Sequence, residues 1–376
     1  MMTSTAPRTA LVVGAGPTGL TAAIGLRRAG VDVRVVDAAT EGANTSRAAV
    51  IHPRTLEVLE PLGVGDAIGA RALRVPRFDI RDGARSVARL SFGGLPTRYP
   101  WTSMISQADT ESILRDRLAA LDVAVEWDSA VTDLAVDDAG RATVRLASGE
   151  TARPDVVVGA DGMHSTVRKM AGIGFPGSGY EQSFVLADVS MDWPVARDTV
   201  SLTFAPDGLA VVAPLPDDRF RVVATLDDAP RHPTASEIEA LLTRRGGSAT
   251  VHDVAWSGRF HVHHRLAESY HQGSVVLVGD AAHVHSPAGG QGMNIGVQDA
   301  VALAETVTAG GALGEYEKRR RPVARRVLAL TDRMTRAATT RGSAVRHARN
   351  GMIRAALSVP PIRRRAAMEL SELTHR

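Results

Sequence analysis

The segment TALVVGAGPTGLTAAIGLRRAGVDVRVVDA, residues 9–38, decides the fold. It begins with an apolar run typical of a buried strand, passes through a glycine turn into a helical pattern that Gly30 ends, and finishes in a second apolar strand. A strand, a helix and a second strand in this order predict a parallel βαβ unit, because parallel strands need a crossover connection. The sequence therefore predicts an α/β fold.

The glycine turn GAGPTG, residues 14–19, matches the G-x-G-x-x-G spacing of dinucleotide-binding domains. Gly14 permits the tight turn, Gly16 lets the backbone approach a pyrophosphate, and Gly19 lets the helix pack closely on the strand. Asp37, at the end of the second strand, is placed to accept hydrogen bonds from ribose hydroxyls. The predicted nucleotide-binding residues of this Rossmann-like domain are Gly14, Gly16, Pro17, Thr18, Gly19 and Asp37. The alternative is a glycine-rich structural turn, and the fingerprint does not separate NAD from FAD, since both carry adenosine diphosphate.

The remaining chain supplies pieces of two domains. Strands separated by Pro/Asp turns (VSLTFAPDG, LAVVAPLPDD, RFRVVATLDD) predict an antiparallel sheet, whereas SVVLVGDAAH returns to a buried-strand pattern and the sequence beyond Gln291 is helical. We predict a discontinuous nucleotide-binding domain of residues 1–75, 100–174 and 269–350, an inserted substrate-binding domain of residues 76–99 and 175–268, and a C-terminal helical tail of residues 351–376.

Composition excludes several classes of protein. The chain has 376 residues, of which 44% are hydrophobic, enough for a large core. Cysteine is absent, which excludes disulfides and thiolate metal ligands, and we predict no metal site. No segment approaches the roughly 20 apolar residues of a membrane span, and the first residues lack a signal-peptide pattern. We therefore expect a cytoplasmic protein with no membrane partner.

Positive charge is concentrated near the C-terminus. Residues 317–365 contain 15 Lys/Arg and 2 Asp/Glu, although the net charge of the whole chain is only +3. This tail could bind nucleic acid, but it lacks interleaved aromatic residues. Its apolar residues Val323, Val327, Leu330 and Met334 follow helical spacing. We interpret it as a helix with a solvated basic face and expect no nucleic-acid partner.

The stretch GDAAHVHSPAGGQGMNIGVQDA, residues 279–300, resembles the ribityl-binding motif of the flavoprotein aromatic hydroxylases, the class typified by p-hydroxybenzoate hydroxylase. The resemblance implies that Asp280 binds ribityl hydroxyls, that Pro287 lies near the flavin ring, and that backbone groups of residues 292–294 hold its pyrimidine edge. A helix starting near Met293 would direct its positive end at negative charge on the flavin. The residues of this motif expected to bind FAD are Gly279, Asp280, Pro287, Gly290, Gly292, Met293 and Asn294. The alternative is a glycine-rich loop before a helix.

The stretch GADGMHSTVRK, residues 159–169, resembles the DG motif of the same family. The resemblance implies that Asp161 and Gly162 serve the binding of FAD and of the nicotinamide cofactor. Arg168 either contacts a ligand or holds the loop together through Asp161, and the sequence leaves both readings open.

Two more contacts are implied by a third stretch and by one glutamine. SRAAVIHPRTLEVLEPLG, residues 46–63, looks like the corresponding part of phenol hydroxylases and aromatic polyketide hydroxylases, which implies that Arg47 contacts FAD near the ribityl chain or the diphosphate. Gln107 matches a family glutamine that contacts the cofactor, although it could be an ordinary helix-start residue. Asp37 departs from the family, because many members have glutamate there.

The resemblance implies an FAD-dependent monooxygenase. In this class NADPH or NADH reduces the flavin, O2 forms a flavin C4a-hydroperoxide, and one oxygen atom passes to an aromatic small molecule, here phenolic or polyketide-like. The cofactor carries the difficult steps, so no catalytic triad is expected, although a base that ionises the phenol would help. Candidates for a role near the flavin or the substrate are His52, His285 and Pro287. For the motif histidines, packing or hydrogen bonding is favoured over proton transfer.

The inserted sheet is expected to lie opposite the flavin ring. Its apolar candidates for contact with the substrate, most of them also ordinary core, are Phe184, Leu186, Val189, Leu202, Phe204, Val212 and Phe220.

Other functions share the same fold. Epoxidation, Baeyer–Villiger oxidation and ring reduction stay open, whereas the four scattered tryptophans lack the Trp-x-Trp-x-x-Pro pattern of flavin-dependent halogenases. A non-catalytic flavin- or nucleic-acid-binding protein is the alternative from another class. The sequence identifies neither the substrate, nor the choice between NADPH and NADH, nor the oligomeric state.

Overall fold

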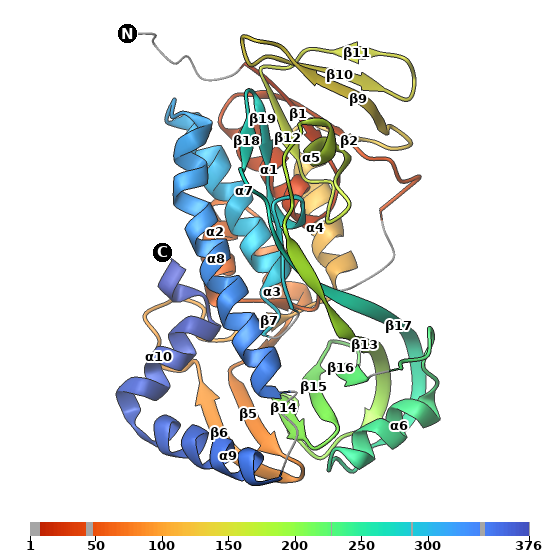
Figure 1. Cartoon of the computed structure of the whole chain (residues 1–376), viewed down its shortest axis with the longest axis vertical. Helices are drawn as coiled ribbons and strands as arrows, with labels where there is room; N and C mark the ends of the chain where they lie inside the picture. The colour runs from red at the N-terminus through yellow and green to blue at the C-terminus, as the bar shows by residue number, and fades with distance from the viewer. Residues whose placement is uncertain (1–7, 43–47, 227, 287–288, 339–342, 376) are drawn as a thin grey trace.

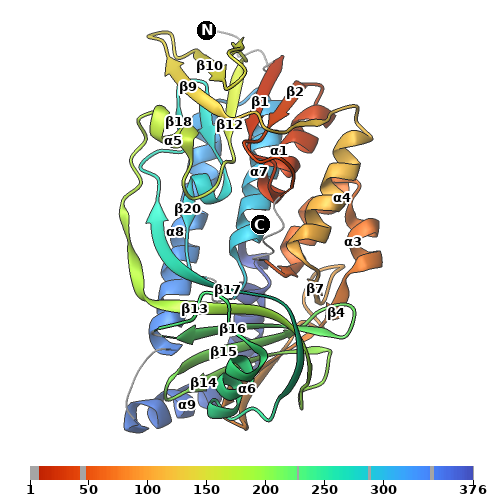
Figure 2. The same ribbon diagram turned by 90° about the vertical axis from the view of Figure 1, so that its right-hand side faces the viewer.

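A computed structural model describes residues 8–42, 48–226, 228–286, 289–338 and 343–375. Figures 1 and 2 show an upper region around a parallel sheet and a lower region around a larger sheet. In the described ranges, no helix is long and apolar enough to cross a membrane.

The upper region is built on a six-stranded sheet. Its strands, in spatial order, are β18 (His271–Gln272), β19 (Val275–Leu277), β12 (Val156–Gly159), β1 (Thr9–Val13), β2 (Asp32–Val36) and β8 (Val125–Glu126). All neighbouring pairs are parallel except β18 and β19. Val12 and Val157 at its centre are fully buried, because the strands are covered on both faces. The predicted parallel α/β sheet is confirmed.

Helices cover this sheet and position its ligand-binding edge. α1 (Pro17–Arg28) packs against α4 (Gln107–Ala119) and α7 (Gly292–Thr308). A Cβ atom at Gly25 would lie 2.7 Å from Cβ of Ala304, so this glycine lets α1 and α7 approach closely. Helix α5 (Thr166–Met170) follows β12, and an antiparallel sheet of β11 (Thr151–Ala152), β10 (Ala142–Leu146) and β9 (Val131–Val136) lies at the top of Figure 1.

Residues 50–75 and 102–104 connect the two regions. They form β3 (Val50–Ile51), α2 (Pro53–Leu59), η1 (Glu60–Leu62), α3 (Gly65–Arg71), β4 (Leu73–Val75) and β7 (Thr102–Met104). The sequence predicts one helix over 54–62, but the last turn is a 3-10 helix. The reason is Pro61, which has no N–H group to continue the α-helical hydrogen bonds.

The lower region contains an eight-stranded sheet. Its strands, in spatial order, are β20 (His283–Val284), β17 (Thr250–Leu266), β13 (Gly177–Asp192), β16 (Arg219–Leu226), β15 (Gly208–Pro214), β14 (Thr199–Ala205), β5 (Arg77–Asp82) and β6 (Arg85–Ser91). The predicted antiparallel pairing is confirmed except between β14 and β5, which are parallel. These two strands are far apart in sequence, so no hairpin fixes their direction. Helix α6 (Ala235–Arg244) covers the face turned away from the upper region (Figure 2).

The C-terminal part is helical, as predicted. It consists of α8 (Leu313–Ala338), α9 (Ser343–Ser358), α10 (Pro360–Leu370) and η3 (Leu373–His375). α9 packs on β6 and runs across residue 350, where the sequence-based division was placed. The predicted solvated face holds for Arg325 and Arg326, which are exposed, but not for Arg320, which is 4% exposed.

Candidate functional site

Three of the predicted ligand-binding segments meet at one edge of the upper sheet. Val13, Gly159 and Leu277 are the last residues of β1, β12 and β19 and lie side by side in register. The glycine turn, the DG loop and the 3-10 helix η2 (Gly279–Ala281) follow these strands directly. Open α/β sheets bind ligands outside the carboxyl ends of their strands, so this edge is the candidate site.

The glycine turn has room for a phosphate only on its outer side. Gly14 has φ of +108°, and a Cβ there would lie 2.4 Å from the carbonyl oxygen of Ala160. A Cβ at Gly19 would lie 1.9 Å from the Gly14 carbonyl oxygen, so both positions require glycine. By contrast, no atom of the described residues lies within 4 Å of a Cβ built on Gly16, the N-cap of α1, and none of their side chains caps this helix. The helix start at Pro17 therefore offers an open anion site.

Asp37 holds the glycine turn against β2. Its carboxylate accepts hydrogen bonds from the backbone N–H of Ala15 at 2.6 Å and of Ala39 at 2.9 Å. Asp37 thus has a structural role at the same edge of the sheet as the candidate site. Its contact with a ribose stays a prediction.

The DG loop is held together by Asp161, but not through Arg168. The Asp161 carboxylate accepts hydrogen bonds from the Ser165 hydroxyl and from backbone N–H groups at the start of α5. The Arg168 guanidinium instead donates to the carbonyl oxygens of Met163 and Ala281, each at 2.9 Å, and stacks on Phe175. Arg168 therefore joins the DG loop to η2. No atom lies within 4 Å of a Cβ at Gly162.

η2 and α7 each have a glycine packed closely against α1. Cβ atoms at Gly279 and Gly296 would lie 2.9 and 2.4 Å from Thr18 Oγ1, so the Thr18 side chain fills the space between them. Asp280, at the same edge, is exposed. Met293, in the first turn of α7, is partly buried against the core. Pro287 lies outside the described residues.

Asn294 ties the start of α7 to the start of α2. Its side chain accepts a hydrogen bond from the backbone N–H of His52 at 2.8 Å and donates to the carbonyl oxygens of Val50 and Gly290 at 2.9 and 2.8 Å. Gly290 has φ of +64°, and a Cβ there would lie 2.3 Å from Val50 Cγ1. Because the Asn294 side chain is used internally, its backbone is the part left to hold a ligand, as the resemblance implies.

His52 is fully buried and His285 is partly buried. His52 Nε2 lies 2.8 Å from the Gly289 carbonyl oxygen, and His285 Nδ1 lies 2.9 Å from that of Ser286. Burial lowers the pKa of each to about 4, and these hydrogen bonds offset only part of the effect. A group with such a low pKa is a poor acceptor for a phenolic proton, which argues for a packing or hydrogen-bonding role.

We expect these two histidines to make the folded protein sensitive to acid. Because their folded-state pKa lies below the unfolded value of about 6.5, the unfolded chain takes up protons first. Their contribution to stability is present above pH 6.5 and is lost as the pH falls toward 4. The melting temperature of the wild type should therefore drop between pH 7 and pH 5. His285→Gln should drop less over this range, whereas His232→Gln, at an exposed histidine, should match the wild type; equal slopes for all three proteins would contradict the assignment.

A buried charged cluster beside the site was missed from the sequence. Asp299 on α7 accepts from His283 Nε2 and from Arg320 Nε, both at 2.6 Å, and all three side chains are at most 5% exposed. Burial opposes ionisation of Asp299, but Arg320 and His283 prevail and lower its pKa. The His283 and His285 rings stack, with centroids 6.4 Å apart. An aspartate within the buried face of α7 was the available signal.

Only part of the predicted apolar set lies on the inner face of the lower sheet. Ala213 packs on Ala49 and Met104 of the upper region, and its register neighbours Arg221 and Asp188 share that face. Phe184 and Leu186 are four and two residues before Asp188 in β13, so their side chains point to the same face of the sheet as that of Asp188. Val189, Val212 and Phe220 pack against α6 on the opposite face, and Phe204 packs with Leu202 and Ile353 of α9. The prediction was wrong for Val189, Val212 and Phe220, because alternation turns them away.

A buried ion pair on this inner face was also missed. Arg221 donates two hydrogen bonds to the Asp188 carboxylate, at 2.7 and 2.6 Å, and the two side chains are 3% and 14% exposed. Phe184, four residues before Asp188, stacks on Phe260 with ring centroids 5.4 Å apart. Opposite charges inside two otherwise apolar strands were the signal in the sequence.

Gln107 is the first residue of α4, and its side chain contacts the backbone of Ala48. Its side-chain oxygen accepts from Ala48 N–H at 3.1 Å, and its amide nitrogen donates to Glu111 at 2.9 Å. The contact holds the chain next to Arg47, which lies outside the described residues.

The residues present fit an FAD molecule. Besides the open helix start at Gly16 and the exposed Asp280, three buried polar atoms near the start of α7 have no hydrogen-bond partner within the described structure: His52 Nδ1, His285 Nε2 and Gln291 Oε1. Buried polar atoms without partners are costly, so unpaired atoms beside a helix start indicate a polar ligand.

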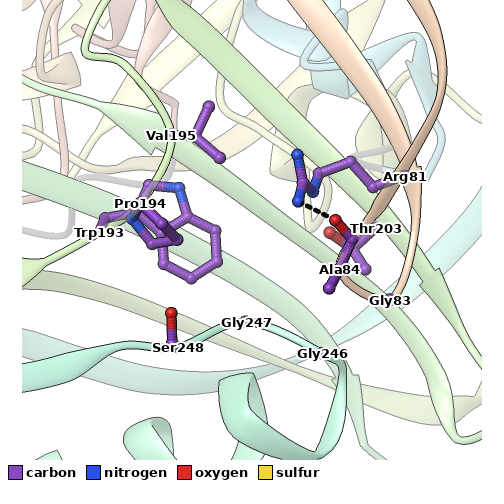
Figure 3. Close-up of a pocket in the computed structure, with 10 residues that line it drawn as sticks. All are labelled: Arg81, Gly83, Ala84, Trp193, Pro194, Val195, Thr203, Gly246, Gly247 and Ser248. Carbon is purple, nitrogen blue, oxygen red and sulfur yellow. Dashed lines mark hydrogen bonds between the residues drawn. The ribbon is translucent and has the colours of Figure 1, made fainter.

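A cavity of about 170 Å³ lies apart from this edge, between the β5–β6 turn, the residues after β13 and the loop before β17 (Figure 3). Arg81 and Trp193 face each other across it, but the Arg81 guanidinium is already paired with Asp79 at 2.8 Å. The cavity belongs to the far end of the lower sheet and contains none of the predicted site residues.

Comparison with known proteins agrees with this geometry. The profile of the family described as FAD binding domain matches residues 8–331. The chain belongs to the FAD-binding monooxygenase family. It is 38% identical over 341 residues to 6-methylpretetramide 4-monooxygenase of Streptomyces rimosus, covering 85% of this chain and 60% of that protein. It is 34% identical over 342 residues to pentachlorophenol 4-monooxygenase of Sphingobium chlorophenolicum, covering 86% and 64%.

The chain therefore spans less than two thirds of the length of these two monooxygenases. A solved structure matches over nearly its whole length: p-nitrophenol 4-monooxygenase PnpA from Pseudomonas putida DLL-E4 has a TM-score of 0.86 and 27% identity, covering 98% of this chain and 99% of that one. This chain and that solved structure therefore share their fold over nearly the whole length.

Proposed function

We propose that this FAD-binding protein is a monooxygenase that uses NADPH or NADH and O2 to hydroxylate an aromatic small molecule, phenolic or polyketide-like. The observation that carries the proposal is how the two sheets join. The loop that leaves the FAD edge at η2 continues as β20, which pairs with β17 and so becomes a strand of the lower sheet. The inner face of that sheet, with stacked Phe184 and Phe260, is thereby linked to the flavin motif.

The relatives support the aromatic class of substrate. The names of the three compared proteins give a pretetramide, a chlorinated phenol and a nitrophenol as their substrates. Phe184 and Leu186, which are buried, supply apolar packing on the inner face of the lower sheet, and the Arg221–Asp188 pair beside them can orient a polar substituent.

The positions of individual residues support their proposed roles. The start of α1 at Gly16 would hold the pyrophosphate, Asp280 would take ribityl hydroxyls, and the backbone of residues 292–294 at the start of α7 would hold the ring. FAD, when bound, accepts electrons from the nicotinamide and activates dioxygen. The chain itself binds and orients the partners and excludes water, because neither buried histidine is suited to remove a phenolic proton at neutral pH.

We expect a good substrate to speed reduction of the bound flavin. The test is anaerobic stopped-flow reduction of the FAD-loaded protein by NADPH and by NADH, with and without a panel of phenols and aromatic polyketides, followed by aerobic turnover and mass analysis. A compound that accelerates reduction at least about tenfold, and yields a product heavier by one oxygen, supports hydroxylation of that class.

Two outcomes would overturn the proposal. Rapid reduction that no compound changes, with no oxygenated product, favours a reductase. Bound FAD that neither nicotinamide reduces favours a non-catalytic flavoprotein.

A further inference from the structure

The segment that follows α10 inserts a carboxyl group between α2 and α7. The Glu372 side chain is fully buried, and its Oε2 accepts a hydrogen bond from Gln298 Nε2 at 2.6 Å and from the Thr55 hydroxyl at 3.3 Å. Gln298 Nε2 also donates to Thr55 Oγ1 at 3.1 Å. One residue earlier, the Ser371 carbonyl oxygen accepts from the backbone N–H of Arg54 at 3.2 Å. Glu372 thus bonds to both helices, and Ser371 adds a second hydrogen bond to α2.

This arrangement costs free energy. Glu372 has φ of +61°, a left-handed conformation that is unfavourable for a residue with a side chain, and its Oε1 has no hydrogen-bond partner among the described atoms. Burial raises its pKa to about 8, although Gln298, Thr55 and the charge of Arg320 act in the opposite direction. The group is therefore a neutral acid at pH 7. A segment that served only to cover apolar surface would need neither the acid nor the strained backbone.

The two residues that Glu372 contacts, Thr55 and Gln298, are close to residues of the predicted flavin site. Thr55 is three residues after His52, and its hydroxyl lies 3.5 Å from the carbonyl oxygen of Asn294. Gln298 is one helical turn after Asn294, whose side chain binds the backbone of His52. Glu372 is therefore connected, through Thr55 and Gln298, to the starts of α2 and α7, where the flavin contacts are predicted.

We propose that Glu372 is a positioning residue for FAD: by bridging Thr55 and Gln298 it fixes the first turn of α2 against the first turn of α7 and so sets the backbone that holds the flavin ring. The inference rests on the proposed function only in taking FAD as the ligand. It assigns to Ser371 and Glu372 a part in cofactor binding, at a distance from the family motifs.

The experiment uses the full chain and compares Glu372→Ala with Glu372→Gln. Glu369→Ala is the matched control, because this carboxylate is three residues earlier and bonds only within its own segment among its described contacts, to Thr374 at 3.0 Å. For each protein we would measure the FAD dissociation constant by flavin fluorescence, the visible spectrum of the bound flavin, and the melting temperature of the apoprotein.

Glu372→Ala should weaken FAD binding at least about tenfold and shift the flavin absorption bands, because the two helix starts are no longer fixed together. Glu372→Gln should restore the dissociation constant to within about threefold, since its amide oxygen can accept the same two hydrogen bonds as the neutral acid. Glu369→Ala should match the wild type in both flavin readouts.

Wild-type affinity and spectrum in Glu372→Ala would overturn the inference, and so would a lowered apoprotein melting temperature with unchanged flavin properties. If Glu372→Ala does not fold, Thr55→Val removes only the hydroxyl of the bridge and must weaken FAD binding for the inference to stand. FAD binding is measured without turnover, so a wild type that binds FAD but hydroxylates nothing contradicts the proposed function and leaves this result readable.

Discussion

A Gly16→Ala variant is expected to fold like the wild type and to bind FAD about 100-fold more weakly, a loss of roughly 2.7 kcal/mol. The backbone of Gly16 is extended, with φ of −73° and ψ of 178°, and within the described part of the chain no atom lies within 4 Å of the new Cβ, so the fold should tolerate the change. The added methyl group would occupy the open side of the helix start, where the pyrophosphate must approach the backbone.

Equilibrium binding of FAD, together with thermal unfolding of the apoprotein, checks this expectation. Gly69→Ala is the control, because Gly69 lies in α3, away from the strand ends, and a Cβ there also meets no atom within 4 Å. An unchanged FAD dissociation constant in Gly16→Ala would show that the pyrophosphate does not pass over this residue. A collapse of the apoprotein would show instead that the turn tolerates no side chain for structural reasons.

The largest loss of stability is expected from Asp299→Leu, which leaves the buried Arg320 and His283 without their shared partner. Removing one member of a buried ion pair costs about 3–5 kcal/mol, because the remaining charge stays out of water and unpaired. Arg320 also supports the first turns of α7, where its guanidinium lies 3.5 Å from the Ile295 carbonyl oxygen. The variant should therefore unfold at much lower urea concentration.

A second ion pair between the same two helices provides the control. Glu305 on α7 and Arg319 on α8 are about half exposed, and their charges are 2.6 Å apart. Because water screens such a pair, Glu305→Gln should cost no more than about 1 kcal/mol. Urea unfolding of both variants at pH 7 measures the difference, and similar small losses in the two would mean that the buried cluster does not stabilise the fold.

Local patterns in the sequence were sufficient for the βαβ unit and for the glycine turn. Gly14 and Gly19 were predictable because their roles depend on neighbours a few residues away and on backbone geometry that glycine alone adopts at low cost. The start of α7 near Met293 was predictable in the same way. The contact partners of these segments were not predictable. Ala160 meets Gly14, and Thr18 meets Gly279 and Gly296, only because distant strands and helices pack together.

The inner face of the lower sheet shows why side-chain orientation and strand pairing in this sheet were not predictable from the sequence. Strand alternation says that Leu186 and Val189 point to opposite faces, but it does not say which face carries α6. The Arg221–Asp188 pair joins two strands through their register. The parallel pairing of β5 with β14 likewise joins residues far apart in sequence.

The sequence by itself determined the α/β class, the dinucleotide-binding fingerprint and the family motifs, because each depends on a short run of residues whose spacing fixes local geometry. Only the tertiary structure decided that Arg320 is buried, that burial lowers the pKa of His52 and His285, and that Glu372 reaches the helices behind the flavin motif. These properties depend on the loss of water around each group, and that loss is set by which distant segments pack against it.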